Sequence, residues 1–344
     1  MTLLVGTAVA ALALGLVPAI ASAVGDPAGT AVTDPKPSTV RAARSAAVSD
    51  ETGWLETDGR IASVYTTASY ASHEVASPDT FLTAGYQAAG GGYAVGFNAD
   101  TATLSAISFS TGDLVTSDAA ALVAAYDALG LVGTTGDEWV LSGQTLDTFT
   151  PVLVLRPFDG GGDIVLPQPP SVDYRQVLAA GPAGALVQDS VSVDDGLGNL
   201  TTTLTVSLIA PGGGSATVIA SGLPTLVDSY PGGAVSSTHV AWRTDTGFSI
   251  APIAGGSVVA VPVALERLDG LVLAKGTAFW FDYFDGVVRM ADSSGVVKTL
   301  VAPNPDAGID VPRPSTLKNG TAAALITASR GATDAGSLNW FTYS

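Results

Sequence analysis

A glycine recurs along this chain at intervals of about 45 residues, each time close to the start of a short apolar segment. The intervals are 44, 48, 49, 43 and 44 residues, and the glycines are Gly92, Gly136, Gly184, Gly233, Gly276 and Gly320. A second glycine-bearing turn followed by a β-branched segment recurs too, as in "SSGVVKTLVAP" at 293–303. Four strands of about five residues with their turns need roughly 40–45 residues, which is the length of one β-propeller blade.

The composition agrees with many short strands joined by tight turns. The 344 residues include 40 Gly and 20 Pro, both of which favour turns, and 47% of the residues are hydrophobic. That content is enough for a large core in one all-β domain. We therefore predict an all-β protein with a β-propeller of six blades. Seven blades is the alternative, if residues 51–77 hold more strands than this count allows.

The two ends of the repeat predict how the ring closes. After Gly320 the last unit is one strand short, whereas "GRIASVYTT" at 59–67 reads as a strand without a unit of its own. A propeller accounts for both, because an N-terminal strand can complete the C-terminal blade and remove the exposed sheet edges. Trp242, Trp280 and Trp340 are expected to pack between blades.

The first 50 residues differ from the rest of the chain. Residues 1–23 contain an apolar segment that ends in Ala21-Ser22-Ala23, which predicts a cleaved secretion signal; retention as an anchor is the alternative. Residues 24–50 are rich in Pro, Ala and Ser and are predicted to be a disordered linker. Residues 51–344 are predicted to form a single propeller domain. The protein is then secreted, extracellular or associated with the cell envelope, and no membrane span remains after cleavage.

One segment favours two structures. "SDAAALVAAYDALG" at 117–130 is rich in alanine and begins with a candidate helix cap, so its intrinsic propensity favours a helix. The repeat requires a strand at the same place, and both outcomes stay open.

One unit shows a family resemblance. The segment "LDGLVLAKGTAFWFDYFDGVVRMADSSGVVKTLVAP" at 268–303 resembles blades of secreted bacterial WD-repeat-like propellers and of six-bladed propellers. The preceding unit has the same outline, with Trp242 at the place of Trp280. The resemblance implies architecture and not activity, because propellers include enzymes, ligand binders and scaffolds.

Acidic residues mark the loops between the second and third predicted strands. A ring of carboxylates there would bind a cationic or hydroxylated ligand, or Ca²⁺, although Asp also favours turns for purely structural reasons. The candidate ligand-binding residues are Asp100, Asp147, Asp245, Asp282, Asp285 and Asp334. The candidate Ca²⁺ site is the loop "SVDDGLGNLTT" with Asp194, Asp195 and Asn199, which lacks the ligand spacing of an EF-hand. No other cofactor is expected.

The sequence contains none of the common motifs of hydrolases, zinc proteases or nucleotide-binding proteins. The chain has two histidines and no Cys, and it contains no G-x-S-x-G, H-E-x-x-H or P-loop motif. A net charge of −17 argues against a nucleic-acid partner. The leading hypothesis is a secreted, monomeric, non-catalytic propeller that binds a protein, a glycan or a cell-wall component. The alternative is an extracellular hydrolase or lyase that acts on a polysaccharide with Asp residues at the channel mouth.

Overall fold

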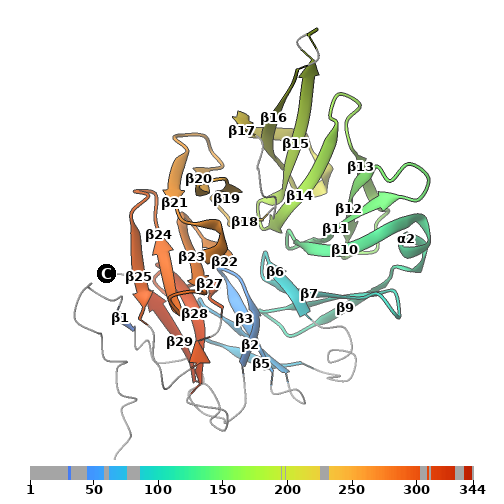
Figure 1. The fold of residues 1–344 in the computed structure, drawn as a ribbon. Coiled ribbons are helices and arrows are strands. Elements are labelled where there is room, and N and C mark those ends of the chain that lie inside the picture. Colours follow the sequence, from blue (N-terminus) through green and yellow to red (C-terminus); the bar gives the residue numbers. More distant parts are fainter. Residues whose placement is uncertain are drawn as a thin grey trace, which may run out of the picture.

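In the computed structural model, short antiparallel strands form seven sheets arranged around a common axis (Figure 1). The structure describes residues 30–31, 45–57, 62–75, 86–194, 196–197, 199–224, 232–302, 308–309, 311–329 and 337–342. The predicted all-β propeller is confirmed, but the predicted number of six blades is wrong, because there are seven. The predicted secretion signal at 1–23 lies outside the described residues.

Each of the first three blades is a four-stranded meander that runs from the axis outward. Blade 1 contains β2 (Ser45–Ser49), β3 (Gly53–Thr57), β4 (Ala62–Thr66) and β5 (Ser72–Glu74). Blade 2 contains β6 (Tyr86–Gly90), β7 (Tyr93–Asn98), β8 (Thr103–Ser108) and β9 (Leu114–Asp118). Blade 3 contains β10 (Tyr126–Thr134), β11 (Glu138–Thr145), β12 (Pro151–Pro157) and β13 (Ile164–Pro167).

The next three blades repeat this order. Blade 4 contains β14 (Tyr174–Gly181), β15 (Gly184–Asp194), β16 (Leu200–Ile209) and β17 (Ala216–Pro224). Blade 5 contains β18 (Gly233–Val235), β19 (His239–Thr244), β20 (Gly247–Pro252) and β21 (Val259–Pro262). Blade 6 contains β22 (Asp269–Ala274), β23 (Thr277–Asp282), β24 (Val287–Ala291) and β25 (Val297–Val301). Short 3-10 turns, η1 (Pro211–Gly213) and η2 (Leu265–Arg267), lie in connecting loops.

Blade 7 joins the two ends of the chain. Its strands are β26 (Gly308–Ile309), β27 (Arg313–Thr316), β28 (Ala322–Ser329), β29 (Ser337–Thr342) and the N-terminal β1 (Thr30–Ala31). β1 pairs with β29, so an N-terminal strand does complete the last blade. The strand predicted for this role was wrong, because residues 62–66 form β4 in the middle of blade 1. Each innermost strand also contacts the innermost strands of both neighbouring blades, which closes the ring.

The blade that the sequence did not predict is blade 1, near the N-terminus. β2 lies within the predicted linker 24–50, and β1 does too, so that segment contributes two strands to the propeller. The marker glycine of this blade is Gly53, 39 residues before Gly92. A Cβ atom at Gly53 would lie 2.2 Å from the Tyr65 carbonyl oxygen and 2.7 Å from Phe109 Cβ, so close packing requires glycine. The shorter unit and its Ala- and Ser-rich first strand conceal the repeat.

Tryptophan side chains fill the spaces between blades. All five are fully buried, and four of them lie on the second strand of their blade. Trp280 packs against Phe248 of blade 5, and Trp54 packs against Trp340 across the closing junction between blades 1 and 7. The prediction that Trp242, Trp280 and Trp340 pack between blades is confirmed.

The alanine-rich segment forms both predicted structures in succession. α2 (Ala120–Ala125) connects blades 2 and 3, and β10 begins at the next residue. Helix propensity prevails where the segment bridges two blades, and sheet pairing prevails where β10 meets β11. Within the described ranges, no helix has the length and apolar character needed to span a membrane.

Candidate functional site

The innermost strands of all seven blades enclose a central channel. Its cavity has a volume of about 310 Å³ and is lined mainly by aliphatic side chains such as Ala88, Ala179 and Leu271. Among the described residues that line the channel, Ser49 and Arg313 are polar. The Ser49 hydroxyl donates a hydrogen bond to the Pro314 carbonyl oxygen at 2.5 Å, which links blade 1 to blade 7.

The two faces of the propeller follow from the antiparallel order of strands. Loops between first and second strands lie on one face, here called the 1–2 face. Loops between second and third strands lie on the opposite face, here called the 2–3 face, together with the connections between blades. At the 1–2 end the inner strands approach very closely. A Cβ atom at Gly90 would lie 2.4 Å from the Thr134 carbonyl oxygen, and one at Gly181 would lie 2.2 Å from that of Val235.

Glu51 closes this narrow end of the channel. It lies in the β2–β3 loop of blade 1, and only 9% of its surface is exposed. Its carboxylate accepts hydrogen bonds from the backbone N–H of Ser237 in blade 5, at 3.1 Å, and of Lys275 in blade 6. The Thr316 hydroxyl of blade 7 donates to the Glu51 carbonyl oxygen at 2.5 Å. One residue thereby connects four blades across the axis.

Two further buried carboxylates link neighbouring blades on the 1–2 face. Asp50 accepts hydrogen bonds from the N–H of Gly92 in blade 2, at 2.6 Å, and from Thr52 and Gly53 in its own loop. Glu138 accepts one from the N–H of Gly212 in blade 4 at 3.1 Å. Burial raises the pKa of both carboxyl groups, and the hydrogen bonds partly oppose this effect.

Sequence reasoning missed Asp50 and Glu51, because both lie at the boundary assigned between linker and domain. A usable signal was present. In "SDETGW" at 49–54 a glycine begins an apolar strand, as in the marker pattern of the later blades, and the two acids lie two and three positions before it.

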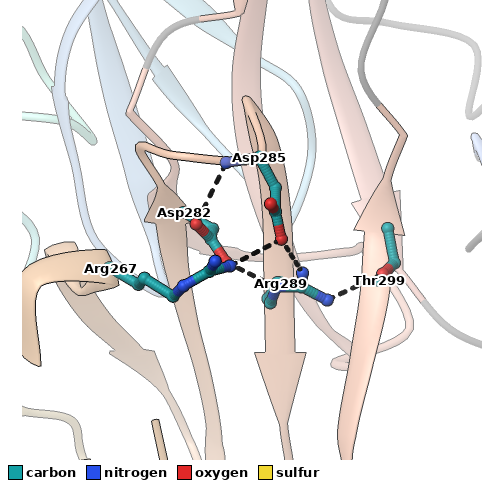
Figure 2. Close-up of polar contacts among 5 residues, drawn as sticks. All are labelled: Arg267, Asp282, Asp285, Arg289 and Thr299. Atoms are coloured by element: carbon teal, nitrogen blue, oxygen red, sulfur yellow. Dashed lines mark hydrogen bonds and ion pairs between the residues drawn. The ribbon is translucent and has the colours of Figure 1, made fainter. Parts of the chain in front are cut away.

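The predicted ligand residues Asp282 and Asp285 do lie together, at the β23–β24 turn of blade 6 (Figure 2). Arg289 donates to Asp282 at 2.9 Å and to Asp285 at 2.6 Å, and Arg267 donates to Asp285 at 2.8 Å. The Asp285 N–H also donates to Asp282. Two arginines therefore neutralise the two carboxylates, and the cluster braces the turn instead of presenting a free acid or base.

The ion pairs of this cluster predict how the stability of the protein changes as the pH falls. Burial alone would raise the pKa of Asp282, but hydrogen bonds from Arg289 and Asp285 N–H and the charges of both arginines lower it below the usual value. A lowered pKa means that the stabilisation is complete above the unfolded-state pKa of about 3.9 and is lost as the pH falls through the folded-state pKa.

Asp282→Asn should therefore be less stable than the wild type near neutral pH, and the difference should shrink below about pH 4. Urea unfolding at several pH values measures this difference. Asp100→Asn, at the exposed β7–β8 turn, is the control and should follow the wild-type curve. A difference for Asp282→Asn that stays constant with pH would contradict the assignment.

The other predicted acids do not converge on one site. Asp147 accepts a hydrogen bond from the N–H of Thr148, and Asp194 accepts one from the N–H of Gly196, so each stabilises its own turn. Asp100 and Asp245 lie at the β7–β8 and β19–β20 turns of other blades. Asp334 lies outside the described residues.

The predicted Ca²⁺ loop is the tip of the β15–β16 hairpin. Asp194 ends β15 and Asn199 precedes β16, whereas Asp195 lies outside the described residues. In the part of the chain that the structure describes, no group of three or more His, Cys, Asp or Glu residues is arranged to hold a metal ion. Ca²⁺ binding at this loop stays a prediction.

Exposed apolar side chains gather on the 2–3 face. They lie in or directly beside the second-to-third-strand loops of blades 3, 4 and 6, and their exposed fractions range from 56% to 86%. The residues are Leu146, Phe149, Val193, Leu197, Leu200, Tyr283 and Phe284. The guanidinium of Arg267 lies 5.6 Å from the ring centroid of Phe284, so the cluster in Figure 2 also holds this aromatic residue in place.

Comparison with known proteins shows a likeness of fold. No family model and no curated protein matches this chain. An acylaminoacyl peptidase in complex with Z-Gly-Gly-Phe-chloromethyl ketone has a TM-score of 0.52 at 10% identity, over 88% of this chain and 51% of that one. A streptogramin B lyase has a TM-score of 0.47 at 11% identity, over 86% and 93%. The β-propeller domain of the Trilobed protease from Pyrococcus furiosus has a TM-score of 0.47 at 9% identity, over 87% and 95%.

Fold and site together define the class of protein. The chain is a seven-bladed β-propeller with an apolar central channel, three buried acids on its 1–2 face and exposed apolar residues on its 2–3 face. At such low sequence identity, the similar structures speak for the fold alone.

Proposed function

We propose that this protein is an exported, non-catalytic binding module that holds a partner protein or a cell-envelope glycan on its 2–3 face. One observation carries the proposal: large apolar side chains stand exposed on this face, on turns that hydrogen bonds and ion pairs hold rigid. Exposed apolar groups that cluster on one face are typical of interaction sites. Their presentation on rigid turns lowers the entropic cost of binding.

The hydrolase or lyase alternative receives less support. Glycoside cleavage by two acids needs a pair of carboxyl groups that can donate and accept protons on either side of the bond. At Asp282 and Asp285 the two carboxylates are instead held by Arg267 and Arg289. The remaining described acids in these loops lie on separate blades.

Site-specific photocrosslinking tests the proposal. A photoreactive phenylalanine analogue at position 149 or 284 should form adducts with components of an envelope extract several-fold more often than the analogue at position 258 or 296. Val258 and Val296 are also exposed but lie in loops between third and fourth strands, on the 1–2 face, so they are matched controls.

Equal adduct yields from both faces would overturn the proposal. Cleavage of a cell-wall polysaccharide by the wild type, abolished in Asp282→Asn, would also overturn the proposal, because that result assigns catalysis to the Asp282 cluster.

A further inference from the structure

A groove runs between blades 3 and 4 on the 2–3 face. Its cavity of about 140 Å³ is lined by Ser142, Gln144 and Pro151 of blade 3 and by Tyr174, Arg175 and Gln176 of blade 4. The floor is fixed, because Arg175 donates two hydrogen bonds to Asp189, at 2.7 and 2.8 Å, and both residues are buried. The groove is separate from the central channel and from the Asp282 cluster.

The β11–β12 turn borders the groove, because Gln144 and Pro151 at the two ends of this turn line it, and the turn carries Phe149. The side chain is 60% exposed, although the backbone of Phe149 has a φ of +53°, a region that bulky residues rarely adopt. Threonine hydroxyls hold the turn: Thr148 contacts Thr145 at 2.7 Å and Thr150 at 2.8 Å. A strained, exposed aromatic residue on a braced turn does not serve stability, which points to a role in binding.

On the other side the groove is lined by β14, which pairs with β15, and the β15–β16 hairpin projects beyond the rest of its blade (Figure 1). The side chains of Ala185 and Val187 face blade 3 and pack against its core. Because side chains alternate along a strand, Val191 and Val193 belong to the same face of β15. Val193 is 59% exposed, so this wall is apolar and in contact with solvent.

The charge around the groove is negative. Asp127 and Asp173 are exposed and directly precede the lining residues Ala128 and Tyr174, and Asp147 and Asp194 are exposed in the β11–β12 turn and at the end of β15. Of the described residues that line the groove, Arg175 is the one cation, and Asp189 neutralises it. The surface therefore complements a ligand that combines positive charge with apolar groups.

We propose that the groove between blades 3 and 4 binds a basic segment of a partner protein, anchored by apolar side chains against Phe149 and Val193. This inference rests on the proposed function and names the class of its partner. A protein segment fits better than a glycan, because the exposed acids complement positively charged side chains, which a neutral sugar lacks, and Val191, Val193 and Leu146 can bury aliphatic side chains of a peptide.

A short labelled peptide of alternating lysine and leucine is the probe, with counterparts that carry glutamate instead of lysine or serine instead of leucine. Fluorescence polarisation with the full chain should show binding of the lysine–leucine peptide, weaker at high salt, and little binding of either counterpart.

The variant Phe149→Gly gives the sharpest test. Glycine adopts positive φ without strain, so the melting temperature should stay unchanged or rise, while peptide affinity should fall about tenfold. Ala102→Gly is the matched control: Ala102 has a φ of +50° at the β7–β8 turn, so the change relieves similar strain and should leave affinity unchanged. Asp147→Asn combined with Asp194→Asn should weaken binding and flatten its salt dependence.

Wild-type affinity in Phe149→Gly, or equal binding of the glutamate peptide, would overturn the inference. Displacement of the peptide by a cell-wall oligosaccharide would also overturn it, by assigning the groove to a glycan. Crosslinking at position 284 tests the proposed function independently, because Phe284 lies on blade 6. If adducts form at position 284 but Phe149→Gly leaves peptide affinity unchanged, the groove is rejected as a binding site and the 2–3 face is retained.

Discussion

Glu51→Ala is expected to lower the free energy of unfolding by about 2–5 kcal/mol, because it removes a buried carboxylate that accepts hydrogen bonds from the backbone N–H groups of Ser237 and Lys275. A hydrogen bond to a charged group contributes about 1.5–3 kcal/mol. Guanidinium unfolding followed by tryptophan fluorescence measures the loss, since all five tryptophans are buried.

Two further variants sharpen this experiment. Glu51→Gln keeps one acceptor oxygen but turns an NH₂ group toward the second donor, so its loss should be intermediate. Glu74→Ala, at an exposed position on the outermost strand of the same blade, should change stability by less than about 0.5 kcal/mol. A Glu51→Ala protein as stable as Glu74→Ala would show that this side chain does not hold the narrow end of the channel together.

Arg175→Ala is the second large effect, with an expected loss of about 3–5 kcal/mol. Arg175 and Asp189 form a two-hydrogen-bond pair between β14 and β15, and their side chains are only 8% and 13% exposed. Removal of the guanidinium leaves the Asp189 carboxylate buried without a counter-ion. Chemical denaturation at neutral pH measures the loss.

A double variant distinguishes loss of the pair from loss of packing. Arg175→Met with Asp189→Leu removes both charges and keeps the volume apolar, so most of the stability should return. The Arg156–Asp163 pair has similar distances but is more exposed, at 13% and 24%, so Arg156→Ala should cost less. If the double variant loses as much free energy of unfolding as its two single variants lose together, the stabilisation comes from other contacts of these side chains.

The fold was predictable because each blade carries its own local signals. Spaced glycines, β-branched strands and buried tryptophans recur within units of about 45 residues, so they are visible without any long-range contact. The first blade was missed because its local signals are weak. Its first strand, "SAAVS", has low strand propensity and is stabilised by pairing with β3 and by contact with β6 and β27. The closing pair β1–β29 joins residues about 310 positions apart, which no local pattern specifies.

The site was less predictable than the fold. The sequence predicted a ring of acids in the loops between second and third strands. The structure instead distributes these acids among separate turns and pairs two of them with Arg267 and Arg289. The sequence did not predict that the apolar residues of the same loops form an exposed set, because a single Phe or Leu in a sequence does not reveal whether it is buried.

The amino-acid sequence by itself determined that the chain folds into repeated four-stranded sheets around an axis, because strand, turn and interblade packing are encoded within each unit. The tertiary structure alone decided that there are seven units and that Glu51 meets Ser237 and Lys275, 186 and 224 residues away. It also decided that blades 3 and 4 enclose a groove lined by Gln144, Pro151 and Tyr174. The physical reason is that ring closure brings together groups from distant units, and burial and charge pairing depend on those neighbours.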